Sequence, residues 1–318
     1  MPAYNVESYV ADALDSVLGQ TWSNLEIIVV NDGSTDGTAK VLASYSDSPR
    51  VTVIDQDNEG AAAARNRAYE ESSGSLIKFF DGDDMLSPEF VEKQVARLQG
   101  SRTHVASAEW ARFYVEPSEA NFEPEPVWRD MEAVEWLVTA WRNARPMMQP
   151  ALWLIPRPLL ERSGPWNEQL SLIDDFEFGA RLLACSDGIR FTPGARLYYR
   201  SGIGSSLSGQ RARAHVESAF RSLMDGTQHL LNRENSPRTR QAAANVLQDF
   251  VYEYYPHHAD LRAKMNRRIA ELGGSNLKPT GPPSFELLRP VLGWKLARRV
   301  ERFAVANGLN RSTMLGNR

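Results

Sequence analysis

The sequence predicts an α/β fold: a mostly parallel, doubly wound sheet flanked by helices, with a helical region towards the C-terminus. Two observations predict it. Short apolar runs alternate with helical patterns through residues 1–100, which is the order typical of βαβ units. Acidic loops follow two of these runs, and ligands of doubly wound sheets bind at the carboxyl ends of the strands.

Each element is predicted from its own pattern. The predicted strands are the apolar runs at 25–30, 51–54 and 75–80. The predicted helices have apolar residues at helical spacing and cover 9–19, 38–45, 61–73 and 87–100. Ser87 is the expected N-cap of the last helix, because Pro88 follows it at a position that favours proline.

The second half of the chain is more mixed. Residues 116–128 are acidic and proline-rich, which predicts a surface loop, and residues 211–270 contain amphipathic helical stretches. Residues 275–284 read as a linker. The tail at 287–303 combines apolar side chains with five basic ones.

Composition excludes several classes of protein. The 318 residues carry a net charge of −4, which disfavours nucleic acid as a partner. Cys185 is the single cysteine, so no intramolecular disulfide can form and a reducing compartment is expected. No apolar run approaches the ~18 residues of a membrane span, and no signal peptide opens the sequence. We therefore expect a cytoplasmic protein.

The first acidic loop is NDGSTDG at 31–37. Asp32, Ser34, Asp36 and Gly37 match the start of a calcium loop, but its twelfth position is Ala43, which offers no side-chain oxygen. A strand-to-helix turn with Ser34 or Asp36 as a cap explains most of the loop. It leaves Asp32 without a role.

The second acidic loop is DGDD at 81–84. Three carboxylates this close repel one another unless a cation lies between them. At a strand end the expected cation is Mg²⁺ or Mn²⁺ bridging phosphate oxygens. A solvated acidic turn that caps the next helix is the plainer alternative. An aspartyl nucleophile of the D-x-D-x-T/V type fits less well, because Met85 stands at its last position.

A third acidic cluster, IDDFEF at 173–178, precedes a helical pattern. Its carboxylates can simply favour a helix N-terminus through the helix dipole. The functional alternative is a general base that takes a proton from an attacking hydroxyl.

With these clusters in place, the chain resembles family 2 glycosyltransferases, nucleotide-sugar-dependent enzymes of the GT-A fold. The resemblance rests on stretches at 2–5, 18–38, 58–68, 79–90, 154–183 and 198–208. It implies a GT-A domain over 1–208, with a nucleotide-binding half at 1–100 and an acceptor and catalytic half at 101–208. A helical region at 209–274 and a linker with a basic tail at 275–318 would follow.

The resemblance also implies roles for single residues. Asp32 would bind the nucleobase, and Asp81 would lie towards the ribose. Asp83 would hold the divalent metal, with Asp81 and Asp84 as the other metal-site residues. Asp175 would be the catalytic base, paired with Asp174. The remaining expected nucleotide contacts come from Pro2, Ala3, Tyr4, Asn58, Gly60, Arg65 and Arg200, with Ser205–Ser206 in the same late loop as Arg200.

The implied activity is metal-dependent, inverting transfer of a sugar from a nucleotide-diphosphate sugar, by default a UDP-sugar. The acceptor would be a glycan, a lipid-linked molecule or a protein. A nucleotidyltransferase is the first alternative, although PAYNVESY at 2–9 lacks its glycine-rich basic loop. A non-catalytic nucleotide- or sugar-binding protein is the second. The basic tail at 285–303 suggests peripheral contact with the inner face of a membrane. The alternative is a tail that packs on the protein or is solvated.

One feature departs from the family pattern. Family members have a central apolar strand directly before P-x-Y-N, whereas this sequence begins at Met1-Pro2. We therefore expect either a start further upstream or a gap in the sheet that exposes apolar surface and unpaired backbone groups. Poor solubility or weak nucleotide binding would follow, and a sharp cooperative melt with tight UDP binding would contradict this expectation.

Overall fold

The computed structural model describes residues 1–144, 146–203 and 212–306. The chain divides into two compact units. The first contains Met1–Thr139 and Met147–Glu234, and the second contains Ala140–Pro146 and Asn235–Arg318. The expected domain boundary at 208 falls outside the described residues, and the first unit continues to Glu234.

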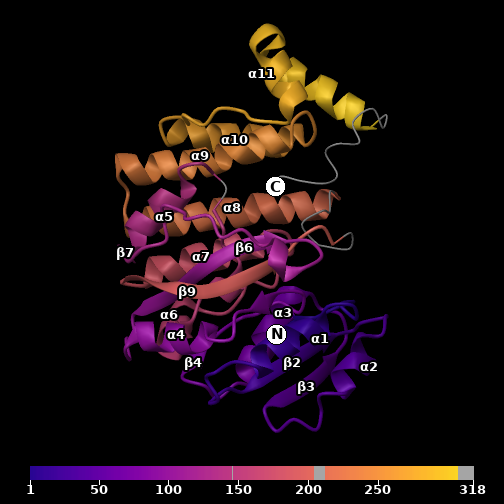
Figure 1. The fold of residues 1–318 in the computed structure, drawn as a ribbon. Helices are drawn as coiled ribbons and strands as arrows, with labels where there is room; N and C mark the ends of the chain where they lie inside the picture. The colour runs from indigo at the N-terminus through magenta and orange to yellow at the C-terminus, as the bar shows by residue number, and fades with distance from the viewer. Residues whose placement is uncertain (145, 204–211, 307–318) are drawn as a thin grey trace. The chain divides into compact units, whose positions relative to one another are not determined.

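A parallel three-stranded sheet forms the start of the first unit (Figure 1). Its strands are β1 (Pro2–Ala3), β2 (Ile27–Asp32) and β3 (Val51–Gln56), in that order. The accompanying helices are α1 (Val10–Leu18), α2 (Thr38–Ala43) and α3 (Ala61–Glu70). All six residues of β2 are buried, which is typical of a parallel strand covered on both faces.

The predicted strand at 75–80 is shorter in the structure. Only Leu76–Ile77 forms a strand, β4, and it pairs antiparallel with β8 (Ile155–Pro156). Residues 78–80 belong to no ladder. A strand needs a hydrogen-bonded neighbour, and the side of this segment towards β2 borders a cavity instead. The α/β class is confirmed, and the sheets are mixed rather than one parallel sheet.

The third sheet has the order β5-β9-β6, with β7 also paired to β9. These strands are β5 (Met85–Leu86), β6 (His104–Phe113), β7 (Met131–Glu132) and β9 (Gly188–Arg200). Helix α4 (Phe90–Leu98) lies against β6 and β9. The prediction that Ser87 is the N-cap of this helix is wrong, because Glu89 holds that position. The Ser87 hydroxyl instead accepts a hydrogen bond from the Arg196 N–H and ties β5 to β9.

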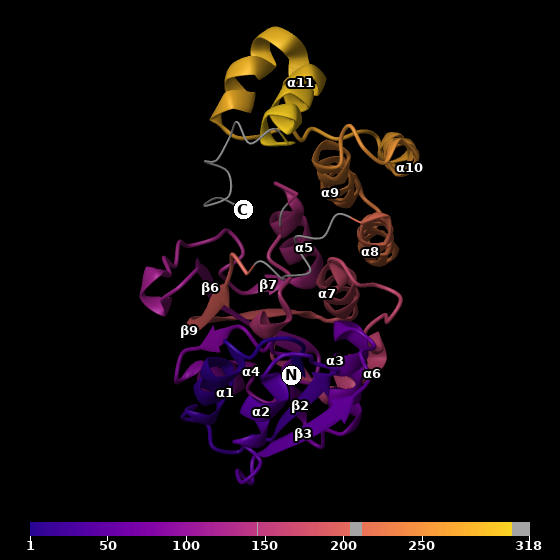
Figure 2. The ribbon, with the colours of Figure 1, turned by 90° about the vertical axis from the view of Figure 1, so that its right-hand side faces the viewer.

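Helices complete the first unit. They are α5 (Ala133–Trp141), which crosses into the second unit, α6 (Arg157–Ser163), α7 (Asp174–Cys185) and α8 (Arg213–Arg233), with short 3₁₀ turns at Pro117–Glu119 and Pro150–Leu152. Figure 2 shows α7 and α8 side by side. Gly226 permits this approach, because a Cβ there would lie 2.6 Å from the Phe176 ring.

The second unit is helical. It contains α9 (Pro237–Glu253), α10 (Ala259–Glu271) and α11 (Pro283–Ala306). Helix α9 begins at a capping box between Ser236 and Thr239. Helix α11 is broken at Gly293, where φ is 71°. Within the described part of the chain, no helix is long and apolar enough to cross a bilayer.

Candidate active site

Asp32 ends β2 and is only 2% exposed. Its carboxylate accepts hydrogen bonds from the backbone N–H groups of Glu59 and Gly60, each at 2.9 Å, and from Gln56 Nε2 at 2.8 Å. Asn58 Nδ2 donates to the Asp32 carbonyl at 3.0 Å. Asp32 therefore anchors the loop at 57–60, and two of the expected nucleotide residues, Asn58 and Gly60, are held through it.

Gly33 makes this anchoring possible. Its φ is +69°, and an added Cβ would lie 2.7 Å from the Asn58 backbone nitrogen. We expect Gly33→Ala to lower the free energy of unfolding by about 1–3 kcal/mol, since it adds a strained φ and a backbone clash. Gly100→Ala is the matched control in urea unfolding, because Gly100 has φ +75° but an open surrounding. If both variants lose the same free energy of unfolding, the added Cβ at position 33 does not clash with the Asn58 backbone.

The segment at 2–5 lies beside the same loop. Asn5 Oδ1 accepts a hydrogen bond from the Thr35 N–H at 2.8 Å, and the Asn5 N–H donates to Ser34 Oγ at 3.1 Å. Ala3 is buried in the β1–β2 ladder, whereas Tyr4 is 49% exposed. Of the three residues expected around the base and ribose, Tyr4 therefore has the most side chain open to a ligand.

Arg65 joins two of the acidic clusters. Its guanidinium donates to Asp81 Oδ1 at 2.8 Å and to Asp174 Oδ2 at 2.9 Å, across 109 residues of sequence. Burial alone would lower the pKa of Arg65, but the Asp81 and Asp174 carboxylates raise it above its ordinary value. Expected to hold the nucleotide, Arg65 is instead engaged with protein carboxylates.

Trp166 fixes the position of this arginine. The Arg65 guanidinium lies over the Trp166 ring at 4.4 Å, and the same ring stacks on Phe178 at 3.9 Å. Asn66 is the next residue of α3. Its Nδ2 donates a hydrogen bond to the Trp166 carbonyl, and its Oδ1 accepts one from the Trp166 N–H. Adjacent residues of α3 thus hold the bridge and its aromatic support.

The three carboxylates of DGDD have different surroundings. Asp84 is fully buried, and it accepts from the Arg200 N–H at 2.9 Å and from Gln149 Nε2. Burial raises the pKa of Asp84 well above its usual range, and the Asp83 and Asp81 charges add to this effect. Burial and the Asp81 charge raise the pKa of Asp83 to about 7.

Arg200 organises the backbone of the same loop. Its Nε donates to the Asp83 carbonyl at 2.9 Å, and its Nη2 donates to Asp12 Oδ2 at 3.1 Å. The guanidinium also lies over the Phe113 ring at 4.5 Å. Ser205–Ser206, expected in the same late loop, lie outside the described residues.

A divalent ion fits part of this acidic loop. Within residues 1–144, 146–203 and 212–306, no three His, Cys, Asp or Glu side chains form a complete metal cage. Mg²⁺ at a nucleotide site typically uses one or two carboxylates and the substrate phosphates, so a cage is not required. Asp83 and Asp81 are partly exposed and fit this donor set, whereas the enclosed Asp84 is committed to Gln149 and Arg200.

Asp174 and Asp175 begin helix α7. Burial and the neighbouring Asp174 charge raise the pKa of Asp175 to about 7. Burial also raises the pKa of Asp174, and the Arg65 charge opposes this shift. A carboxylate with a pKa near neutrality can accept a proton and release it again, as a general base must.

The loop before α7 is held from α8. Ile173 has φ +52°, an unfavourable conformation for a β-branched residue. Ser222 Oγ donates to the Ile173 carbonyl at 2.5 Å, and Ser218 Oγ accepts from the N–H groups of Ser171 and Leu172. These two serines stabilise the turn that presents the aspartate pair.

The raised pKa of Asp175 predicts a stability effect. The folded state holds this proton more tightly than the unfolded state, so stability falls as pH rises from about 4 to 7 and then levels off. Asp175→Asn removes the buried charge, and we expect its melting temperature to exceed that of the wild type by about 3–6 °C at pH 8. Thermal melts at pH 4.5 should show little difference, and an equal gain at both pH values would contradict this origin.

The structure thus brings together Arg65, Asp81 and Asp174, with Asp83, Asp84, Asp175 and Arg200 around them. Asp32, Asn58 and Gly60 form a separate group, linked by the hydrogen bonds of Asp32. Pro2 and Ala3 pair with β2, the strand that ends at Asp32. Sequence reasoning missed Gln149, Trp166, Ser218 and Ser222. The contacts of these four residues join positions far apart in sequence, so no local motif marks them. The acidic motifs that they support were the only signal in the sequence.

Comparisons with known proteins identify the family of this chain. A family model described as "Glycosyl transferase family 2" matches residues 1–161. Glycosyltransferase GlyA of Streptococcus pneumoniae serotype 4 is 37% identical over 114 residues, or 36% of this chain and 16% of GlyA. The uncharacterised glycosyltransferase EpsJ of Bacillus subtilis is 28% identical over 208 residues, or 63% of this chain and 59% of EpsJ. The matched chain therefore spans less than two thirds of either relative.

A solved structure shares the fold. The crystal structure of S. aureus TarS 1-349 in complex with UDP-GlcNAc superposes with a TM-score of 0.69 and 18% sequence identity. The match covers 96% of this chain and 90% of that chain. At this identity the likeness shows the GT-A fold.

Proposed function

Since the chain belongs to glycosyl transferase family 2, we propose that it transfers a sugar from a nucleotide-diphosphate sugar to a hydroxyl group of an acceptor. The observation that carries this proposal is the Arg65 bridge, which places the DGDD loop next to the Asp174–Asp175 pair. A donor-side acidic loop and a candidate base are thereby held in one site.

The donor would lie along the ends of β1 and β2. Tyr4 and the loops held by Asp32 would contact the nucleoside, and Asp83 with Asp81 would hold the divalent ion at the diphosphate. When bound, that ion supplies positive charge that stabilises the departing nucleoside diphosphate. Asp84, Gln149 and Arg200 would position the loop rather than bind the ion.

Asp175 would act on the acceptor. Its carboxylate removes the proton from the acceptor hydroxyl, and the hydroxyl oxygen attacks the anomeric carbon opposite the leaving group. The bond to the nucleoside diphosphate breaks, and the anomeric configuration inverts. Asp174, engaged by Arg65, would keep the adjacent Asp175 at the start of α7 and contribute to its raised pKa.

UDP is the nucleotide to test first, because the TarS structure of the same fold was determined with UDP-GlcNAc. We expect calorimetric titration to show Mn²⁺-dependent binding of UDP in preference to GDP, CDP and dTDP. Asp83→Ala should weaken UDP binding by about 30-fold or more, equivalent to roughly 2 kcal/mol. Asp47→Ala, which changes an exposed aspartate, is the control.

Equal UDP binding in Asp83→Ala would contradict the assigned ion site. Binding of a nucleoside triphosphate in preference to a diphosphate would favour a nucleotidyltransferase. A folded protein that binds none of the four nucleotides would contradict the proposed function itself.

We also propose that α11 makes peripheral contact with a membrane. Its exposed apolar residues are Leu287, Val291, Leu292, Leu296, Val300, Phe303 and Val305. Lys295 and Arg299 add positive charge next to them, which would favour an anionic surface. In liposome flotation, replacing Leu287, Val291 and Phe303 with Ser should reduce binding to anionic vesicles severalfold. Unchanged flotation would contradict the proposal.

A further inference from the structure

Four side chains at the ends of β6 and β9 form a wall next to the candidate active site. They are Trp110, Arg112, Tyr199 and Ser201, and we call them the Arg112 shelf. Arg112 is opposite Tyr199 in the parallel β6–β9 ladder. Its guanidinium lies over the Tyr199 ring at 4.9 Å and over the Trp110 ring at 5.9 Å. Its Nη1 donates to Ser201 Oγ at 2.9 Å, so two rings and a hydroxyl hold the guanidinium in place.

The shelf adjoins both acidic clusters of the site. Tyr199 directly precedes Arg200, whose N–H donates to Asp84 at 2.9 Å. Burial raises the pKa of Tyr199, and the charges of Asp84 and Asp175 raise it further. The phenol therefore lies within electrostatic reach of the DGDD loop and of the candidate base.

The shelf faces away from the proposed nucleotide contacts. Successive side chains of a strand point to opposite faces of a sheet. Arg200 reaches Asp12 of α1 and the Asp83 carbonyl, on the side where the nucleotide is proposed to bind. Tyr199, one residue earlier, lies with Arg112 on the other face. An anion at Arg112 would thus approach from the acceptor side.

Arg112 has donors left for a ligand. Among residues 1–144, 146–203 and 212–306, no carboxylate forms an ion pair with it, and its bond to Ser201 is its one hydrogen bond. A guanidinium has five N–H donors in a fork that matches a carboxylate or a phosphate. Arg65 and Arg200 are instead engaged with protein groups. Because Arg112 is half-buried, an anion of the ligand would compensate a partly desolvated charge.

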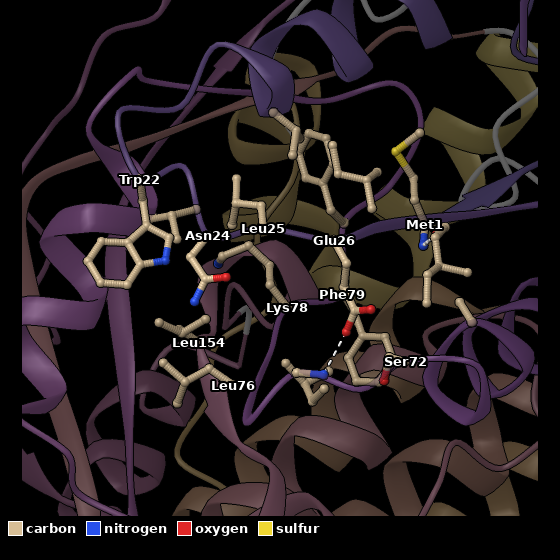
Figure 3. Close-up of a pocket in the computed structure, with 18 of the residues that line it drawn as sticks. Met1, Trp22, Asn24, Leu25, Glu26, Ser72, Leu76, Lys78, Phe79 and Leu154 are labelled. Atoms are coloured by element: carbon tan, nitrogen blue, oxygen red, sulfur yellow. Dashed lines mark hydrogen bonds between the residues drawn. The ribbon is translucent and has the colours of Figure 1, made fainter. Parts of the chain in front are cut away.

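The cavity of about 370 Å³ beside β2 offers no comparable group. Figure 3 shows Glu26 and Lys78 in its lining. Glu26 accepts hydrogen bonds from the N–H groups of Ser73 and Gly74. Lys78 Nζ donates to the Ala151 carbonyl at 2.7 Å. Both charges are therefore already engaged with the protein.

The charge of the active site gives the shelf a purpose. The DGDD loop contributes three carboxylates and the Asp174–Asp175 pair two more, against the charges of Arg65 and Arg200. A negatively charged acceptor would be repelled by this site unless a cation lay on its own side. Arg112 supplies that cation close to the candidate base, whereas an uncharged acceptor would not need it.

We propose that the Arg112 shelf selects an acceptor that carries a phosphate or carboxylate group near its attacking hydroxyl. The Arg112 fork would bind this group, and the Ser201 hydroxyl and the Tyr199 ring would fix the direction of the fork. This inference rests on the proposed sugar transfer and adds a substrate class to it, an anionic acceptor rather than a neutral one.

The test uses three small probes: glucose, glucuronate and glucose 6-phosphate. Each is titrated into the full chain by ligand-observed NMR, once without nucleotide or metal and once with saturating UDP and Mg²⁺. We expect glucuronate, glucose 6-phosphate or both to bind about tenfold or more tightly than glucose in either state, and the tighter one identifies the anion. Arg112→Met should reduce this preference to about threefold or less, while UDP affinity stays within about threefold of the wild type.

Arg196→Met is the matched control. Arg196 is on the same strand as Tyr199 and lies over the Phe122 ring at 5.0 Å, but it already pairs with Glu109 at 3.2 Å. This variant should keep the preference of the wild type. Anionic probes that bind the wild type no more tightly than glucose would overturn the proposal, and so would an equal loss of preference in both arginine variants.

Weaker binding of UDP to Arg112→Met would place the anion on the donor and would also overturn the proposal. The comparison of the three probes on the wild type needs no variant, so it decides the question even if Arg112→Met is unstable. A folded wild type that binds none of the nucleotides contradicts the proposed function, whether or not it prefers the anionic probes. One that binds UDP but shows no such preference contradicts only the role of Arg112.

Discussion

Asp175→Asn is expected to lower the rate of sugar transfer by about 10²–10⁴-fold, because the amide cannot accept the proton of the acceptor hydroxyl. UDP binding should stay within about threefold of the wild type, because the substitution preserves shape and leaves the Arg65–Asp174 pair intact. Transfer rates and UDP titration on the same preparation measure both effects. A non-catalytic binding protein would lose nothing through this change.

The pH profile gives an independent test of the same role. Since the pKa of Asp175 is raised to about 7, the wild-type rate should increase with pH below about 7 and level off above it. Asp187→Asn, an exposed position just beyond α7, is the control and should keep the wild-type rate and profile. Full activity of the Asp175→Asn variant would show that another group is the catalytic base.

Arg65→Met is expected to have the largest effect on stability. It leaves the Asp81 and Asp174 carboxylates without their shared partner in a poorly solvated position, a change that typically costs about 3–5 kcal/mol. The Met side chain fills much of the volume over Trp166, so the loss reports mainly on charge. Urea unfolding measures it, and UDP binding should weaken as the DGDD loop loses its anchor.

Arg67→Met is the matched control on the same helix. Arg67 pairs with Glu71 on an exposed surface, and such pairs contribute about 0–1 kcal/mol. If both arginine variants unfold at the same urea concentration, the bridge contributes nothing special to stability. If Arg65→Lys restores most of the stability, a single charge is sufficient and the two-carboxylate geometry of the guanidinium is dispensable.

Residues Met1–Ala3 lie along the edge of β2, with Ala3 buried and Pro2 opposite Val30. The weak nucleotide binding and poor solubility expected from the family pattern stay predictions.

The sequence by itself determined the fold class and the positions of the acidic motifs. The run at 25–30 and the helical spacing at 9–19 are local patterns, and β2 and α1 form within a few residues of them. Glycine and carboxylate clusters at strand ends are also local signals. They were enough to single out Asp32, the DGDD loop and the Asp174–Asp175 pair.

Only the tertiary structure decided what these residues contact. Arg65 looked like a nucleotide ligand, and its bridge depends on α3, the DGDD loop and α7 meeting in space. Gln149 and Trp166 belong to no recognisable motif, because a single glutamine or tryptophan in a sequence does not indicate what its side chain contacts. The strand at 75–80 was shortened for the same reason: its propensity is local, but a ladder requires a partner strand at hydrogen-bonding distance.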